Sequence, residues 1–307
     1  LIGKMNRAAE KCGVKPQLLV DLQGPELRTG TVAEPVALRN GDIVEICEIS
    51  ENVKAGRSTK IMLPELTLPY LVPGQEVLLD DGKIHLKIVE KAENVTENGG
   101  ENTQEKRYFA KVLWGGLLKS RKSAALPGAK IYPPTLTNSD LANIKIAKEM
   151  GVTGVMQPFV RDHSDLERVK EALREAGAED IRLFAKIENM DGVRKLEKLL
   201  PAADEIVIAR GDLGNAVHLW DLPGVQRQIS EKCRAAGKPF MVVTQMLASM
   251  ERSPVPTRAE VNDIFHAVMD GAASIMVTGE TAVGDYPVEV IRYMVNTVRS
   301  AEKEENR

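Results

Sequence analysis

From about residue 130 onward, short apolar runs rich in β-branched residues alternate with segments of helical periodicity. The runs are apolar at nearly every position, which is typical of strands covered on both faces in a parallel sheet. Regular strand–helix alternation predicts an α/β fold, either a closed barrel or an open sheet with right-handed crossovers. The expected strands lie at 153–159, 181–188, 204–210, 239–244 and 273–278. The expected helices lie at 138–150, 163–177, 191–200, 222–237, 257–271 and 287–302.

A sixth expected strand, at 16–22, follows a helical pattern at 1–12. A closed (β/α)8 barrel needs eight strands. The sequence therefore contains six of the eight, and two alternatives stay open. An N-terminal piece with two strands is absent from this sequence, or the sheet is open.

The segment between the first strand and the others has a different character. In 76–90, Ile84, Leu86 and Ile88 alternate with polar residues, which predicts a β-hairpin. The polar stretch 93–104 reads as a hairpin loop. We therefore expect residues 31–124 to form a small all-β domain. It would interrupt an α/β body made of residues 1–30 and 125–307.

Composition narrows the class of protein. A net charge of −3 argues against a nucleic-acid surface, which needs a clustered excess of Lys and Arg. Cys12, Cys47 and Cys233 are widely spaced, which indicates reduced thiols and neither a disulfide framework nor a zinc site. No apolar run approaches the roughly 18 residues of a membrane span. A cytoplasmic protein without nucleic-acid or membrane partners is expected.

Functional residues of a parallel α/β body lie where its strands end. Lys186 and Glu188 are two positions apart on one strand and therefore project to the same side. Asp212 follows the next strand, so two carboxylates could hold Mg²⁺ or Mn²⁺ together. The alternative is a plain buried ion pair between Lys186 and Glu188. The polar residues at or just past strand ends are Asp21, Arg161, Glu188, Asp212, Thr244 and Glu280.

Four further features each allow a functional and a structural interpretation. The turn around Gly211 could present backbone N–H groups to an anion or simply connect a strand to a helix. Glu280 could support the site or belong to a tight loop. Arg28, after a Gly-Pro turn, could contact phosphate or mark the hinge into the inserted domain. Lys122, at the return hinge, could bind substrate or be a solvated lysine.

Taken together, the motifs resemble those of the pyruvate kinase family over essentially the whole chain. The order and spacing are specific, although no single motif is. The matching stretches are DLQGPELRTG at 21–30, LPG at 126–128, FVR at 159–161, AKIEN at 185–189, ARGDLG at 209–214, GKPFMVVTQMLASM at 237–250, PTRAEVNDIFHAVMDG at 256–271 and GETAVGDYP at 279–287.

The resemblance implies a (β/α)8 TIM barrel interrupted by a mobile β-rich lid, and an enzyme that moves the phosphoryl group of phosphoenolpyruvate to ADP. Lys186 would be catalytic and neutralise charge on the phosphoryl group in flight. Glu188 and Asp212 would bind Mg²⁺ or Mn²⁺. The backbone of Gly211 and Asp212 would hold the substrate carboxylate, together with Thr244, which would also be catalytic.

The resemblance also places Asp21 in a potassium site and makes Arg28 and Lys122 substrate-binding residues, with Glu280 and Arg161 in support. A cytoplasmic homo-oligomer that binds ADP, ATP and pyruvate is expected.

The chain also departs from the family. It has no counterpart of the R-x-N-x-SHG segment or of the C-terminal domain. Leu22 stands where a threonine is usual, which makes K⁺ dependence doubtful. Two other functions therefore stay open: a metal-dependent aldolase or lyase acting through a pyruvate enolate, and a non-catalytic metabolite-binding relative.

Overall fold

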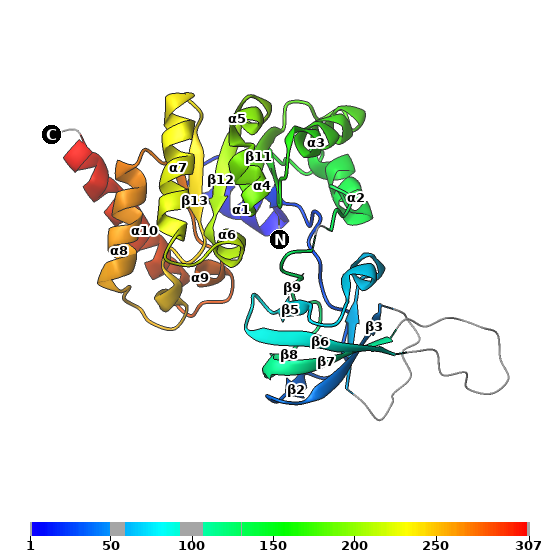
Figure 1. The fold of residues 1–307 in the computed structure, drawn as a ribbon. Helices are drawn as coiled ribbons and strands as arrows, with labels where there is room; N and C mark the ends of the chain where they lie inside the picture. The colour runs from blue at the N-terminus through cyan, green and yellow to red at the C-terminus, as the bar shows by residue number, and fades with distance from the viewer. Residues whose placement is uncertain (1, 50–58, 93–106, 130, 306–307) are drawn as a thin grey trace. The chain divides into compact units, whose positions relative to one another are not determined.

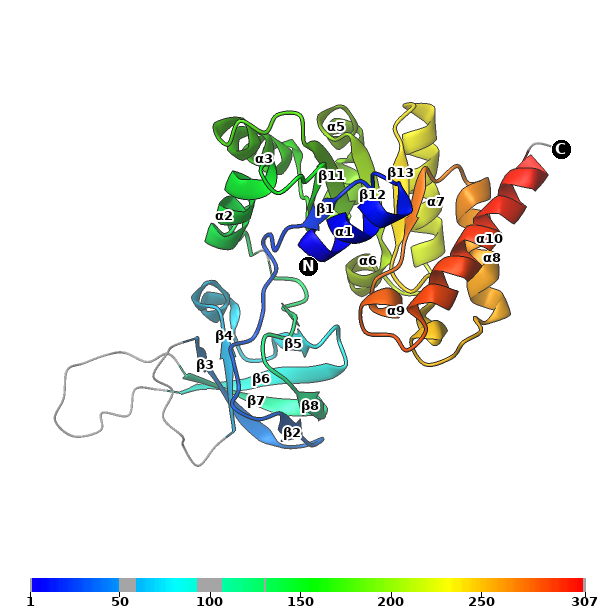
Figure 2. The ribbon, with the colours of Figure 1, turned by 180° about the vertical axis from the view of Figure 1, so that it is seen from behind.

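The computed structural model describes residues 2–49, 59–92, 107–129 and 131–305. The chain divides into two compact units, shown from opposite sides in Figures 1 and 2. The first unit is Leu1–Gly24 with Pro134–Arg307, and the second is Pro25–Pro133. The segment expected to form the inserted domain, 31–124, lies within the second unit, which extends beyond it at both ends.

A curled sheet of six parallel strands forms the centre of the first unit, within the described residues, and its strands neighbour one another in sequence order. The α/β class and all six expected strands are confirmed. Their apolar side chains alternate between the two faces of the sheet, as the two-residue period of a strand requires. The strands are β1 (Leu19–Asp21), β10 (Gly154–Gln157), β11 (Arg182–Ile187), β12 (Glu205–Ala209), β13 (Phe240–Val243) and β14 (Ser274–Met276).

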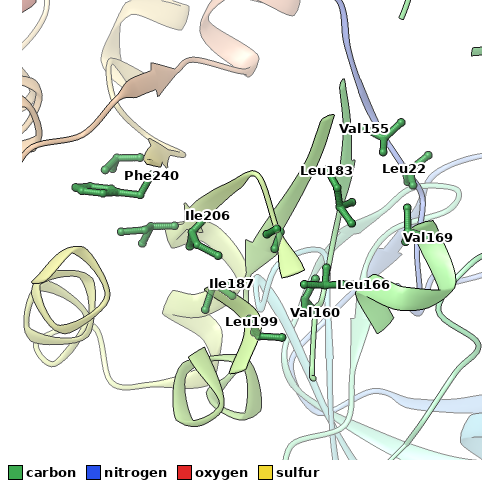
Figure 3. Close-up of a cluster of buried hydrophobic side chains, with 14 of the residues drawn as sticks. Leu22, Val155, Val160, Leu166, Val169, Leu183, Ile187, Leu199, Ile206 and Phe240 are labelled. Atoms are coloured by element: carbon green, nitrogen blue, oxygen red, sulfur yellow. The ribbon is translucent and has the colours of Figure 1, made fainter. Parts of the chain in front are cut away.

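One face of this sheet packs against helices and contains the main core. Figure 3 shows Val155, Leu183, Ile206 and Phe240, from four neighbouring strands, together with side chains of the covering helices such as Leu166 and Leu199. On the opposite face lies a smaller buried cluster made of Met156, Phe184, Val207, Ala209, Met241 and Val243. The strands are thus covered on both sides, which explains their nearly continuous apolar sequence.

Most of the expected helices are present. They are α1 (Ile2–Cys12), α2 (Asn138–Ala147), α3 (His163–Glu175), α7 (Leu222–Ala235), α8 (Arg258–Met269) and α10 (Pro287–Glu305). Figure 2 shows α1 on the face of the sheet turned away from α7. Helix α8 begins with the capping box expected from the sequence, in which Thr257 and Glu260 bind each other's backbone N–H groups.

The helix expected at 191–200 is instead divided. Lys195 has φ −97° and ψ 9°, outside the α-helical range, and separates α4 (Met190–Arg194) from α5 (Leu196–Leu199). Two short helices that the sequence did not predict begin within three residues of a strand end. They are α6 (Arg210–Ala216) and α9 (Gly279–Ala282).

The second unit is β-rich and mostly antiparallel. The expected hairpin is formed by β5 (Glu76–Leu79) and β6 (Ile84–Ala92), with Leu79 paired to Ile84. Ile84, Leu86 and Ile88 are buried, as their alternation predicts. The loop expected at 93–104 falls outside the described residues. The remaining strands are β2 (Val36–Leu38), β3 (Ile43–Glu48), β4 (Lys60–Leu63), β7 (Arg107–Trp114), β8 (Gly116–Leu118) and β9 (Ala124–Ala125).

A buried carboxylate holds the ends of the first unit where the chain leaves and re-enters it. Asp140 Oδ1 accepts from the Gln23 N–H at 2.7 Å, and Oδ2 accepts from the N–H groups of Gly24 at 3.0 Å and Thr137 at 2.9 Å. Residue 24 ends one segment of this unit and residue 134 begins the next. One side chain therefore ties the outgoing segment to the returning one.

Replacing Asp140 by Ala is expected to lower the free energy of unfolding by about 3 kcal/mol, because one buried and two part-buried backbone donors lose their acceptor. Chemical denaturation measures the change. Asp180→Ala is the control, since Asp180 is exposed and forms a surface ion pair with Lys148. Equal stability of the two variants would show that Asp140 does not organise this junction.

Candidate active site

The centre of the candidate site is the end of β11. Lys186 lies on the same face of the sheet as Phe184, two residues before it. Its Nζ atom lies 3.2 Å from Glu188 Oε1. The side chains are 13% and 2% exposed, respectively. The expectation that these two residues share one side is confirmed, and the ion pair that was the structural alternative is present.

A second carboxylate binds the same ammonium group. Asp21, at the end of β1, places Oδ1 at 3.1 Å and Oδ2 at 3.0 Å from Lys186 Nζ. Strand β10 lies between β1 and β11, so Lys186 reaches across it. Lys186 is therefore held between Glu188 and Asp21. The residue that the resemblance places in a potassium site here binds an ammonium group.

Asp212 brings a further negative charge to Glu188. Strand β12 ends at Ala209, and Asp212 lies in the first turn of α6. Burial raises the pKa of Glu188, and the charge of Asp212 raises it further. The ammonium of Lys186 and the N–H of Phe159, which donates to Glu188 Oε2 at 2.6 Å, act in the opposite direction. The net result is a pKa of about 7.

Lys186 is charged despite being buried. Burial by itself would lower the pKa of its ammonium group. The carboxylates of Glu188 and Asp21 outweigh this effect and hold the pKa above its usual value. The positive charge of Lys186 is thus a fixed feature of the site at neutral pH.

The excess of negative charge around Glu188 suits a hard divalent cation. Glu188 and Asp212 are oxygen donors, and their mutual repulsion falls when a cation lies between them. Mg²⁺ commonly takes one or two protein carboxylates and completes its shell with water and substrate oxygens. Among residues 2–49, 59–92, 107–129 and 131–305, no group of three or more His, Cys, Asp or Glu side chains could hold a metal. Glu188 and Asp212 are the candidate protein ligands at this site.

The end of β13 has an unusual backbone. Thr244 has φ +83° and Gln245 has φ +55°. A left-handed conformation is costly for a β-branched residue and is found mainly at functional sites. A Cβ atom placed on Gly211 would lie 3.0 Å from Thr244 Cγ2, so the absence of a side chain at 211 lets the two approach. The structure therefore places Thr244 against Gly211, which precedes Asp212.

Two of the expected supporting residues have structural partners. Arg161 forms a two-pronged ion pair with Asp165, with Nε–Oδ2 at 3.0 Å and Nη2–Oδ1 at 2.7 Å. Glu280 is buried and accepts from the N–H groups of Thr278 at 2.7 Å and Leu247 at 3.2 Å. Glu280 therefore links the loops after β13 and β14, which agrees with the tight-loop interpretation.

The two expected substrate residues of the second unit are close in that unit. The Thr29 N–H donates to the Lys122 carbonyl at 2.8 Å, and Arg28 Nη1 donates to the Arg121 carbonyl at 2.8 Å. Lys122 is not simply solvated, because its Nζ lies 2.6 Å from Asp80 Oδ1.

Two residues that contact expected site residues were not predicted from the sequence. One is Asp80, which begins the Asp-Asp-Gly turn of the β5–β6 hairpin, and this turn was its available signal. The other is Arg210, which donates to the Thr244 carbonyl at 2.7 Å. It was expected as the last residue of a strand, and no local pattern distinguishes it.

The comparison with known proteins agrees with the motifs. Residues 1–291 match the sequence profile described as pyruvate kinase, barrel domain. The pyruvate kinase of Bacillus licheniformis is 36% identical over 308 aligned residues, which cover 98% of this chain and 50% of that protein.

Two further pyruvate kinases give similar figures. That of Geobacillus stearothermophilus is 36% identical over 294 residues, covering 95% of this chain and 48% of that protein. That of Chlamydia trachomatis serovar D is 32% identical over 303 residues, covering 98% and 60%. The chain thus spans about half to three fifths of the length of these curated relatives. No helix in the described part of the chain is long and apolar enough to cross a membrane.

Proposed function

The chain belongs to the pyruvate kinase family, and on that premise we propose that it transfers the phosphoryl group of phosphoenolpyruvate to ADP, giving pyruvate and ATP. The observation that carries this proposal is the arrangement at the end of β11. There the ammonium of Lys186 lies 3.2 Å from the carboxylate of Glu188, whose pKa is raised by burial and further by the charge of Asp212.

Lys186 is the proposed catalytic residue. Phosphoryl transfer spreads negative charge over the oxygens of the group in flight, and catalysis depends mainly on positioning and on fixed positive charge. Lys186 is largely buried and stays protonated at neutral pH, so little solvent screens its charge. Its two carboxylate partners hold the ammonium in place before substrate binds.

Glu188 and Asp212 are the proposed holders of Mg²⁺ or Mn²⁺. When bound, such an ion would act as a Lewis acid and neutralise charge on the substrate oxygens. Glu188 is oriented for this role by the Phe159 N–H, which fixes one of its carboxylate oxygens. The repulsion between the Glu188 and Asp212 carboxylates would then be relieved by the bound cation, which favours metal binding.

The backbone of Gly211 and Asp212, with the Thr244 side chain, is the proposed seat of the substrate carboxylate. The residue before α6, Ala209, makes no side-chain capping hydrogen bond to the N–H groups of the first turn. Thr244 occupies the space that a side chain at position 211 would need. A hydroxyl and backbone N–H groups are suitable donors for a carboxylate.

The second unit is proposed to act as the lid, with Arg28 and Lys122 as its phosphate-binding residues. Closing such a lid would exclude water and protect the phosphoryl group from hydrolysis. Small-angle scattering with and without nucleotide tests this, since unchanged dimensions would contradict a moving lid. The same family premise supports a cytoplasmic homo-oligomer.

Potassium is proposed as a dispensable ion for this chain. Asp21 offers a carboxylate, but its neighbour Leu22 has an apolar side chain packed in the main core. No hydroxyl is therefore available at position 22 to add a ligand. Equal turnover with and without K⁺ is the expected result.

The deciding experiment is pyruvate release from phosphoenolpyruvate with Mg²⁺, in the presence and absence of ADP and of K⁺. It is run on this chain and on any longer natural form. ADP-dependent turnover would establish the kinase function. If neither form releases pyruvate although Mn²⁺ and phosphoenolpyruvate still bind, a non-catalytic relative is favoured. Turnover of a pyruvate-derived substrate without ADP would favour the aldolase or lyase alternative.

The raised pKa of Glu188 gives metal binding a pH dependence. A proton and a cation compete for this carboxylate, so Mn²⁺ affinity is expected to fall roughly tenfold between pH 8 and pH 6 around a pKa of about 7. Electron paramagnetic resonance of free Mn²⁺ measures it. In Glu188→Gln the affinity should vary much less with pH in this range, and an unchanged pH profile would exclude Glu188 as the titrating ligand.

The same shift affects stability of the metal-free chain with the opposite sign. The folded pKa of Glu188 lies above its usual value of 4.5. Between these two pH values the folded chain holds a proton that the unfolded chain has lost. This group's contribution to the free energy of unfolding is therefore present below pH 4.5 and is lost as the pH rises through 7.

A further inference from the structure

The strained backbone after β13 needs a restraint. Thr244 and Gln245 are consecutive residues with positive φ, at +83° and +55°. Such a conformation is unfavourable for residues other than glycine and persists only where surrounding contacts impose it. The contacts at the Thr244 carbonyl show where the restraint comes from.

Arg210 makes these contacts. Its Nη2 atom donates to the Thr244 carbonyl at 2.7 Å and lies 2.8 Å from Met246 Sδ. Its Nη1 atom lies 2.8 Å from Asp263 Oδ1 and 2.7 Å from Oδ2. Within the described part of the chain, the buried Nε atom has no hydrogen-bond partner. The two terminal nitrogens therefore make the contacts. Nη2 binds the strained segment, and Nη1 binds Asp263 of α8.

Arg210 also lies next to the Gly211–Asp212 backbone, the second part of the proposed carboxylate-binding seat formed by Gly211, Asp212 and Thr244. Arg210 begins α6 and directly precedes Gly211, where an added Cβ atom would lie 3.0 Å from Thr244 Cγ2. Its backbone thus belongs to the β12–α6 turn, while its side chain holds the turn after β13. Asp263 orients the guanidinium from α8 and balances its charge. Three separate segments are joined through one side chain.

We propose that Arg210 is a positioning residue that sets the geometry of the Gly211–Thr244 seat, with Asp263 as its anchor. The inference rests on the proposed function only in naming the substrate carboxylate as the group received there. Arg210 acts through the Thr244 backbone, and its positive charge is engaged by Asp263. A displacement of about 1 Å at such a seat can lower activity about 100-fold.

The test uses Arg210→Lys, because lysine keeps the charge but its single nitrogen cannot hold Asp263 and the Thr244 carbonyl in the same planar arrangement. Asp263→Asn is the second variant and removes the anchor. Arg182→Lys is the matched control, since Arg182 pairs with buried Glu205 at the opposite end of the strands. The probes are Mn²⁺, oxalate as a carboxylate ligand, and the methyl resonance of Thr244.

We expect Arg210→Lys to shift the Thr244 methyl resonance, to lower oxalate affinity in the presence of Mn²⁺ about 10- to 100-fold and to leave Mn²⁺ affinity within about twofold. Asp263→Asn should act in the same direction, and Arg182→Lys should change none of these. Unchanged oxalate affinity in Arg210→Lys, or equal losses in Arg210→Lys and Arg182→Lys, would overturn the inference.

The two proposals fail separately. If the unsubstituted protein binds oxalate but releases no pyruvate from phosphoenolpyruvate, the kinase function falls. The positioning role of Arg210 would still be supported by a shifted Thr244 resonance and weakened oxalate binding in Arg210→Lys. If the unsubstituted protein does not bind oxalate with Mn²⁺ either, the Gly211–Thr244 seat is not a carboxylate site, and the inference is overturned.

Discussion

Replacing Lys186 by Met is expected to lower phosphoryl transfer from phosphoenolpyruvate to ADP by about 1,000-fold or more. The ammonium is the fixed positive charge of the site, and removing a single such group from a phosphoryl-transfer or oxyanion site typically has an effect of this size. Mn²⁺ affinity measured well above pH 7 should change little, because Lys186 is not one of the cation's ligands. Near pH 7 the loss of the ammonium would also raise the pKa of Glu188 and favour its protonation over Mn²⁺ binding. Steady-state kinetics and Mn²⁺ titration on the same samples measure both quantities.

Lys238→Met is the matched control for this variant. Lys238 is partly buried, donates to the Ala203 carbonyl, and lies just before β13, at the opposite end of the strand from Thr244. Its replacement removes the same group from a comparable environment and should leave turnover unchanged. Parallel loss of turnover and of Mn²⁺ binding in Lys186→Met would mean that Lys186 maintains the site's structure and has no direct part in transfer.

Glu188→Gln is expected to lower Mn²⁺ affinity by at least the roughly 10- to 100-fold that loss of an outer-shell partner costs at metal sites. The amide keeps the shape of the side chain but removes the charge that Asp212 would share around a cation. Folding should survive, since Glu188 is already protonated over part of the neutral range at a pKa of about 7. Electron paramagnetic resonance and calorimetric titration measure the affinity.

Glu205→Gln makes the same chemical change elsewhere in the sheet. Glu205 is buried at the start of β12, where its carboxylate binds Arg182 and Ser274. It should affect stability and leave Mn²⁺ affinity unchanged. Unaltered Mn²⁺ affinity in Glu188→Gln would contradict a shared ion at Glu188 and Asp212, and would leave the Lys186–Glu188 contact as a structural ion pair.

The sheet could be predicted well because its signal is local and strong. Phe240 and Ile206 belong to short apolar runs whose neighbours on both faces are buried, and each run became a parallel strand in the expected order. The helices around the site were harder to predict. Segment 191–200 divides at Lys195, and α6 forms from Arg-Gly-Asp-Leu-Gly, a sequence with two glycines and low helix propensity.

The candidate site, like the fold, has some features that the local sequence predicts and others that it does not. A two-residue period places Lys186 and Glu188 on one side of a strand, and the ends of parallel strands bring Asp212 to the same edge. These relations follow from the sequence alone, together with the family resemblance.

Only the tertiary structure decided the rest. The contact between Lys186 and Asp21 joins residues 165 positions apart and depends on strand order and curvature. The left-handed backbone of Thr244 and the grip of Arg210 on its carbonyl depend on packing between separate loops. The pKa of Glu188 depends on its burial, on the charges of Lys186 and Asp212, and on the backbone N–H of Phe159. Short-range periodicity determines which side a residue faces, whereas charge, strain and burial are set by neighbours that are distant in the chain.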